Sequence, residues 1–360
     1  MKTVAEFSIK YQQILDPGGE LVGPLPPFAM DSAELVRMYR MMTFARLMDV
    51  KAVNLQRTGK LGTYASCLGH EATHVGVGAA MRPEDVLAPV YREYGAQLWR
   101  GVKMREILLY WGGDERGNDF AGPRQDFAWC VPIATQSAHA AGAAMAFKLR
   151  GEKRCAVGFI GDGGTSEGAF YEALNLAGAR ALPVVFVIVN NGYAISMPLA
   201  EQTAAMTLAQ KGIAAQVPGM QVDGNDAIAV RQVVGDALET ARSGGGPALI
   251  EAITYRLSDH TTADDASRYR SADEVKKAWL AEPLVRLRAY LTRTGAWSEA
   301  AEQALQQEGA RTVEAEVAGY LATPKQSTDT MFDYLFAETP RHLLAQRAAA
   351  RRFPGPGGGH

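Results

Sequence analysis

The strongest constraint on the fold is a strand–helix–strand pattern between residues 155 and 191. Residues 155–160 and 183–189 are short, apolar and β-prone, so both are expected to be buried strands. Between them, residues 166–182 carry Phe170, Leu174 and Ala177 at helical spacing, which predicts a helix with one buried face. A strand, a helix and a second parallel strand form one βαβ unit. This unit predicts an α/β fold with a mostly parallel sheet.

Polar residues follow each of these strands at its expected end. Asp162 lies between glycines directly after the first strand, and Asn191 lies in an Asn-Asn-Gly turn after the second. Ligands of parallel sheets bind beyond the carboxyl ends of the strands, so the two side chains should meet. The glycines allow close approach of backbone to an anion, and a helix opening near Thr165 offers free amide hydrogens. A carboxylate and an amide oxygen suit Mg²⁺ that also takes phosphate oxygens.

Other phosphate-binding motifs do not fit the glycine-rich run. A dinucleotide-binding fingerprint that starts at Gly161 needs a third glycine at position 166, which is Ser166. A P-loop needs a Gly-Lys-Ser/Thr run, and none follows. From spacing alone, an ordinary turn between a strand and a helix remains an alternative.

The composition is that of a globular protein with a sizeable core, since 47% of the residues are hydrophobic and 21% charged. A net charge of −2 argues against a nucleic-acid binder. The sequence has no apolar run of membrane-spanning length, and its first residues lack the apolar stretch of a signal peptide. Cys67, Cys130 and Cys155 are scattered, which predicts free thiols in a reducing cytoplasm.

Several runs together resemble a known family. They are Gly-Asp-Gly-Gly-Thr-Ser-Glu-Gly at residues 161–168, Glu-Ala-Leu-Asn at 172–175 and Asn-Asn-Gly-Tyr-Ala-Ile-Ser at 190–196. The first and last look like the thiamine diphosphate motif. Over residues 30–325 the chain resembles the alpha subunit of the first, decarboxylating component of 2-oxo acid dehydrogenase complexes. The resemblance implies a three-layer α/β sandwich of the thiamine diphosphate-binding type, with thiamine diphosphate and Mg²⁺ as cofactors.

The resemblance also implies roles for individual residues. Mg²⁺ is expected on Asp162, Asn191 and the carbonyl of Tyr193. The residues expected to contact the organic cofactor are Tyr91, Arg92, Val131, Ile133, Asp162, Gly163, Gly164, Asn191 and His260. In isolation, Arg92 would be interpreted as a surface ion pair with Glu93, and the resemblance favours the diphosphate instead. Branched-chain members of the family can hold a K⁺ ion in the segment around Val131. Val131 replaces a Ser that some of these members have, which argues against a K⁺ site in this chain.

Three histidines need separate interpretation. His70 and His74 form an i, i+4 pair that could bind metal, but no third ligand is suggested nearby, so satisfied helix histidines are expected. His260 lies in a charged loop that composition alone describes as solvated. The resemblance makes this the active-site loop, and we expect His260 to donate a proton during acyl transfer because a pKa near neutrality suits that task.

Three regions are expected along the chain. Residues 1–30 are rich in Pro and Gly and predict an extended arm that lies on a partner. Residues 31–337 form the dehydrogenase domain, which opens with a helix capped by Asp31 that ends near Thr58. Residues 338–360, which are rich in Arg, Gly and Pro, predict a disordered tail.

The implied reaction is oxidative decarboxylation of a 2-oxo acid, with transfer of the acyl group to the lipoyl arm of a partner acyltransferase. The sequences of the polar loops favour pyruvate as the substrate, and branched-chain 2-oxo acids such as 3-methyl-2-oxobutanoate are the alternative. The resemblance also implies a glutamate that faces the aminopyrimidine ring of the cofactor and comes from a beta subunit. Because this chain carries one cofactor half-site, we expect a beta subunit to complete the site in an α₂β₂ assembly. A non-catalytic scaffold of the same fold is a remote alternative. No nucleic-acid or membrane partner is expected.

Overall fold

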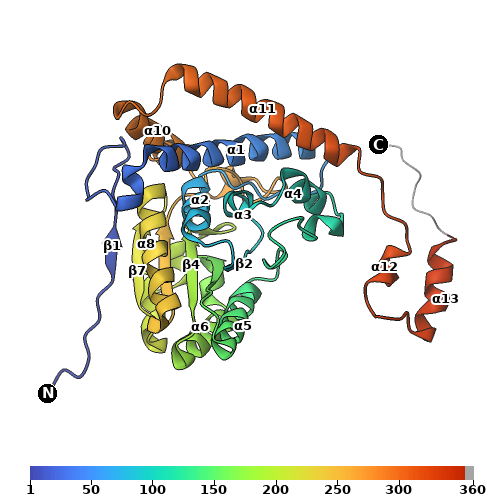
Figure 1. The fold of residues 1–360 in the computed structure, drawn as a ribbon, viewed down its shortest axis with the longest axis horizontal. Helices are drawn as coiled ribbons and strands as arrows, with labels where there is room; N and C mark the ends of the chain where they lie inside the picture. The colour runs from blue at the N-terminus through green and yellow to red at the C-terminus, as the bar shows by residue number, and fades with distance from the viewer. Residues whose placement is uncertain (353–360) are drawn as a thin grey trace.

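The structure is a computed structural model that describes residues 1–352. A six-stranded sheet forms its centre, and every strand runs parallel to its neighbours (Figure 1). In spatial order the strands are β1 (Lys10–Gln12), β7 (Gly219–Asp223), β8 (Ala248–Ile253), β4 (Val184–Asn190), β3 (Ala156–Gly161) and β2 (Val86–Ala88). The predicted strands at 155–160 and 183–189 are therefore confirmed as the adjacent strands β3 and β4.

Helices cover both faces of the sheet. Val185 and Val187 of β4 pack into one core cluster with α1 (Ser32–Arg57), α2 (Glu71–Ala80) and α8 (Ala227–Thr240). Val184, Phe186 and Ile188 pack into a second cluster with α5 (Thr135–Arg150) and α6 (Gly168–Arg180). Successive side chains of a strand point to opposite faces, so an unbroken apolar strand feeds both clusters. The expected three-layer α/β sandwich is confirmed.

The long helix α1 begins where the sequence predicts it. The side chain of Asp31 caps the helix by accepting a hydrogen bond from the amide of Ala33 at 2.9 Å. Met38, Met42 and Met48 of this helix are buried. The C-terminal half of α1 packs in a third apolar cluster with α3 (Tyr94–Arg100), α4 (Met104–Trp111) and α11 (Glu299–Leu321). Figure 1 shows α11 lying along α1.

The remaining strands and α-helices are mostly short. They are β5 (Tyr193–Ala194), β6 (Met197–Pro198), α7 (Leu199–Gln202), α9 (Ala272–Trp279), α10 (Pro283–Arg293), α12 (Thr330–Asp333) and α13 (Arg341–Ala350). The segment predicted to be a disordered tail, residues 338–360, thus contains helix α13, and its last residues, 353–360, lie outside the described residues. Figure 1 shows α12 and α13 lying apart from the sheet.

The N-terminal segment, expected to be an extended arm, supplies the edge strand of the sheet. Asp226, at the start of α8, fixes the residues that follow β1. One carboxylate oxygen accepts hydrogen bonds from the amides of Ile14 at 2.8 Å and Leu15 at 2.6 Å. The other accepts from the amides of Ile228 and Ala229, both at 3.1 Å, and so caps α8. A single buried carboxylate therefore joins the arm to the domain.

Substituting Asp226 should destabilise the whole domain. In Asp226→Ala the four amides lose their acceptor, so we expect the free energy of unfolding to fall by about 2–4 kcal/mol. Asp236→Ala, an exposed site on the same helix, is the matched control and should change it by less than about 0.5 kcal/mol. Urea titrations followed by circular dichroism measure both values. Equal stability of the two variants would contradict the role of Asp226.

Candidate functional site

A cavity of about 680 Å³ opens beyond the carboxyl ends of β3 and β4. Its walls include every residue that the sequence analysis singled out for cofactor or metal binding. These are Tyr91, Arg92, Val131, Ile133, Asp162, Gly163, Gly164, Asn191, Tyr193 and His260. The structure thus brings together residues from segments that are far apart in the sequence. Contact with one cavity does not by itself assign their individual roles.

Asp162 and Asn191 follow the paired ends of β3 and β4 and line the same cavity, as the strand order requires. Asp162 is 2% exposed and Asn191 is 8% exposed. One carboxylate oxygen of Asp162 accepts a hydrogen bond from Nε2 of Gln202 at 2.9 Å. Burial raises the pKa of Asp162, and the Gln202 hydrogen bond opposes that rise. A buried carboxylate beside an amide oxygen is a donor set that a hard divalent cation would stabilise.

The three glycines around Asp162 are subject to different steric constraints. A Cβ atom added to Gly163 would lie 2.5 Å from Cβ of Ala194, and one added to Gly164 would lie 2.7 Å from Cγ1 of Ile160. Packing therefore requires glycine at both positions. A Cβ atom at Gly161 would meet nothing within 4 Å among the described residues, so at this position the space is open. The cavity floor is bare backbone that a ligand can approach closely.

The turn after β3 differs from the predicted helix start near Thr165. Residues Gly163–Ser166 form a short 3₁₀ helix, and α6 begins only at Gly168. The hydroxyl of Thr165 donates to the carbonyl of Asp162 at 2.7 Å, and the buried ammonium of Lys211 donates to the carbonyl of Thr165 at 2.9 Å. These bonds hold the turn directly beneath the cavity.

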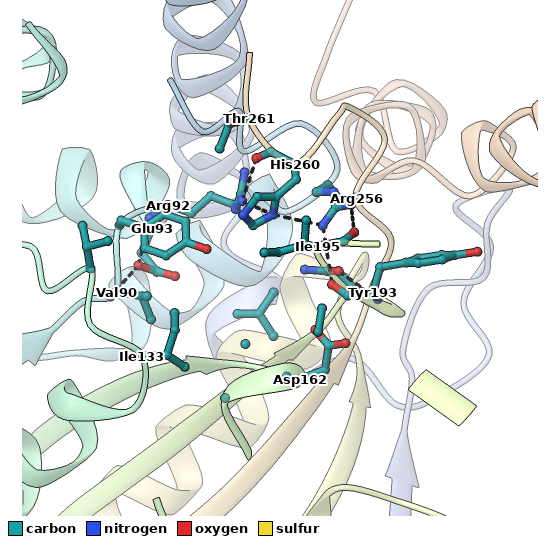
Figure 2. Close-up of a pocket in the computed structure, with 18 of the residues that line it drawn as sticks. Val90, Arg92, Glu93, Ile133, Asp162, Tyr193, Ile195, Arg256, His260 and Thr261 are labelled. Carbon is teal, nitrogen blue, oxygen red and sulfur yellow. Dashed lines mark hydrogen bonds between the residues drawn. The ribbon is translucent and has the colours of Figure 1, made fainter. Parts of the chain in front are cut away.

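Two guanidinium groups flank His260 at the opposite end of the cavity (Figure 2). Nη2 of Arg92 lies 3.3 Å from Nδ1 of His260 and donates to the His260 carbonyl at 3.0 Å. Nη1 of Arg256 lies 3.3 Å from the same Nδ1. Both groups can only donate, so Nδ1 must accept and the proton of the neutral ring lies on Nε2. This end of the cavity is cationic and presents one neutral imidazole N–H.

The expected near-neutral pKa of His260 is wrong for the chain without a ligand. Burial, followed by the charges of Arg92 and Arg256, lowers the pKa to about 3. At pH 7 the ring is therefore a neutral hydrogen-bond donor and not an imidazolium acid. An anion bound between the guanidinium groups would oppose this shift.

Arg92 does not form the surface ion pair that its sequence context alone would suggest. Arg92 is 6% exposed, and no salt bridge to it occurs within residues 1–352. The carboxylate of Glu93 instead accepts from the amides of Val90 at 2.8 Å and Arg92 at 3.2 Å. A buried guanidinium without a carboxylate partner, at a cavity wall, is suited to bind an anionic ligand.

His70 and His74 are not the satisfied helix histidines that the sequence analysis predicted. Both are buried, and their four ring nitrogens have no hydrogen-bond partner in the described part of the chain. Their rings lie edge to face with centroids 5.6 Å apart, and His70 also lines the cavity. Burial lowers the pKa of both, that of His74 to about 3, so both rings are neutral. No metal-binding group of three or more His, Cys, Asp or Glu side chains occurs among residues 1–352.

Sequence reasoning missed two residues that shape this site. Arg256 follows the end of β8, so the rule that located Asp162 could also have found it, but it lay at the edge of an apparently mobile loop. Gln202 contacts Asp162 only because residues 193–202 fold back over the turn after β3. No local pattern at Gln202 signals that contact.

Comparison with known proteins matches this chain to one protein family and to dehydrogenase subunits of two kinds. The family model described as "Dehydrogenase E1 component" matches residues 39–328. The pyruvate dehydrogenase E1 component subunit alpha of Staphylococcus aureus is 39% identical over 350 residues, covering 96% of this chain and 94% of that protein. The 3-methyl-2-oxobutanoate dehydrogenase subunit alpha of Mycobacterium tuberculosis is 43% identical over 315 residues, covering 87% and 86%. Within residues 1–352, no helix is long and apolar enough to cross a membrane.

The buried His74 should make the protein sensitive to mild acid. Its pKa is about 3 in the folded chain and about 6.5 when unfolded, so the unfolded state binds the extra proton as the pH falls below 6.5. The variant His74→Phe keeps a ring against Phe159 but cannot bind this proton. When the pH is lowered from 7.5 to 5, we expect its free energy of unfolding to fall by about 1–2 kcal/mol less than that of the wild type. The exposed His342→Gln serves as control. Denaturant titrations at both pH values test this, and an unchanged pH slope in His74→Phe would refute it.

Proposed function

The chain belongs to the dehydrogenase E1 component family, and from this premise we propose that it is the alpha subunit of a 2-oxo acid dehydrogenase. The reaction is oxidative decarboxylation of a 2-oxo acid, with acyl transfer to the lipoyl group of a partner acyltransferase. One observation carries the proposal. A single cavity is lined both by the Asp162–Asn191 pair and by the Arg92–Arg256–His260 cluster.

The residues at the cavity wall fit thiamine diphosphate and Mg²⁺. Asp162, Asn191 and the carbonyl of Tyr193 would hold the ion. The diphosphate would lie on Gly163, Gly164, Tyr91, Arg92 and His260, and the rings would lie against Val131 and Ile133. Val131 and Ile133 are 49% and 45% exposed, apolar surface that suits an organic ring. When bound, thiamine diphosphate supplies the nucleophilic carbon and the electron sink that the decarboxylation requires.

The residues of this chain would bind and orient that group. Arg92 and Arg256 supply positive charge to an anionic ligand, and their shared contact with Nδ1 of His260 keeps Nε2–H available as a donor. A role of His260 in proton transfer to the lipoyl sulfur stays a proposal. It requires a bound anion to raise the pKa of His260 from about 3.

Within residues 1–352, this cavity has no buried carboxylate that is free to act as a general base. The carboxylate of Glu93 is occupied by two backbone amides, Asp162 is assigned to the cation, and Glu167 lies exposed at the cavity edge. We therefore propose that a beta subunit supplies a glutamate and completes the site in an α₂β₂ assembly. The exposed apolar side chains of Ile195 and Val131 at this cavity support burial by a partner.

Pyruvate is the favoured substrate, and 3-methyl-2-oxobutanoate is the alternative, since relatives of both names match this chain. We assign the reaction to residues 31–337, which include the matched residues 39–328. The cysteines are free thiols, which supports a reducing, cytoplasmic location. A non-catalytic scaffold remains the remote alternative.

Removing the Asp162 carboxylate should abolish Mg²⁺-dependent binding of thiamine diphosphate. We expect the affinity of Asp162→Ala in the assembled complex to fall by at least about 100-fold, because a metal ligand is lost. Asp162→Asn keeps the shape and should show the same loss. Neither variant should be less stable than wild type without metal, since burial disfavours the charged carboxylate. Calorimetric titration measures the affinity, and wild-type binding by either variant would disprove the assignment.

The reaction itself is tested by reconstitution. The purified chain alone should show negligible decarboxylation, and addition of its beta subunit should restore it, with pyruvate turned over faster than 3-methyl-2-oxobutanoate. Release of CO₂ with an artificial electron acceptor measures both rates. The reverse preference would establish the branched-chain alternative. Full activity of the chain alone would rule out the shared site, and an inactive complex without bound cofactor would favour the scaffold.

A further inference from the structure

Gln202 connects the proposed cation site to the segment that folds over it. It is the last residue of α7, which follows the β5–β6 hairpin directly. The amide of Leu199 donates to the carbonyl of Gly192 at 2.9 Å and closes this segment. Tyr193, whose carbonyl we propose as a ligand of the cation, and Gln202 therefore belong to one folded unit.

The side-chain amide of Gln202 is held in one orientation. Nε2 donates to Oδ2 of Asp162 at 2.9 Å and to the carbonyl of Met197 at 3.0 Å. If the amide were rotated by 180°, its oxygen would face two other oxygens that can only accept. The positions of the nitrogen and the oxygen in this amide are therefore fixed by its two partners. Because Nε2 occupies Oδ2, Asp162 keeps Oδ1 for another ligand.

The other end of this amide has no partner. Oε1 of Gln202 is buried and accepts no hydrogen bond from any residue in 1–352. It lies 3.8 Å from the position of a Cβ atom on Gly163, and so borders the turn that carries Asp162. A buried acceptor without a donor is unfavourable, so a donor is expected beside it when the site is filled. Mg²⁺ usually keeps several water molecules, and these are donors.

We propose that Gln202 is a positioning residue of the cation site, an inference that rests on the proposed function. Nε2 would fix the rotation of the Asp162 carboxylate and leave Oδ1 to hold the ion, and Oε1 would accept a hydrogen bond from a water bound beside it. Groups that orient metal ligands typically change metal affinity by about 10–100-fold when they are removed.

A purely structural role makes a different prediction. Through Nε2 and the carbonyl of Met197, Gln202 also fastens the hairpin, and loss of that contact alone would lower stability with or without metal. A positioning role lowers metal affinity, and high metal concentration restores function. The two roles therefore separate in a metal titration.

The experiment uses the assembled complex with thiamine diphosphate and Mn²⁺ as the probe. Electron paramagnetic resonance measures free Mn²⁺ for the wild type, Gln202→Ala and Gln202→Met, which retains the length of the side chain. The matched control is Glu201→Ala, an exposed neighbour on the same helix. Thermal unfolding without metal monitors the hairpin.

We expect both Gln202 variants to raise the Mn²⁺ dissociation constant by at least about 10-fold, with decarboxylation recovered at saturating metal and Glu201→Ala unchanged. Wild-type affinity in both variants would overturn the inference. So would a loss that saturating metal does not reverse and that follows lowered thermal stability. Absence of Mn²⁺ binding by the wild type would instead refute the proposed function, so the two failures can be distinguished.

Discussion

The parallel pairing of β3 with β4 determines the rest of the site. Their register aligns Gly161 with Val189, so the residues that follow both strands emerge at one edge of the sheet. Both strands are buried on both faces, and a shift of register would misplace their apolar side chains in both core clusters. The stability of the core thus fixes the position of Asp162 relative to Asn191. Hydrophobic packing of these two strands therefore determines the geometry of the site.

Charge is distributed unevenly along the cavity. At one end, burial raises the pKa of Asp162, and no cation from residues 1–352 forms a salt bridge with it. Around His260, burial lowers the pKa of Arg256, and Arg92 lies close by without a salt bridge to any residue in 1–352. A ligand that combines a divalent cation with an anionic group would relieve both penalties. This complementarity is a physical reason to expect a metal-bound diphosphate in the cavity.

The parts of the fold set by local periodicity could be predicted from the sequence. The strands β3 and β4, the buried face of α6 and the Asp31 cap of α1 all follow from spacing and capping rules. Properties that depend on the surroundings could not be predicted. The low pKa of His260 arises from Arg92 and Arg256, and the unpartnered nitrogens of His70 arise from tertiary burial. Helix α13 lies in a segment whose composition indicated disorder.

The most direct test of the account is the position of the cation in the assembled complex. Crystals of the α₂β₂ complex grown with thiamine diphosphate and Mn²⁺ would give an anomalous difference peak at the ion. The account predicts that this peak lies about 2.0–2.3 Å from oxygens of Asp162 and Asn191, at the carboxyl ends of β3 and β4. A bound cofactor whose ion lies elsewhere, with neither residue as a ligand, would contradict it.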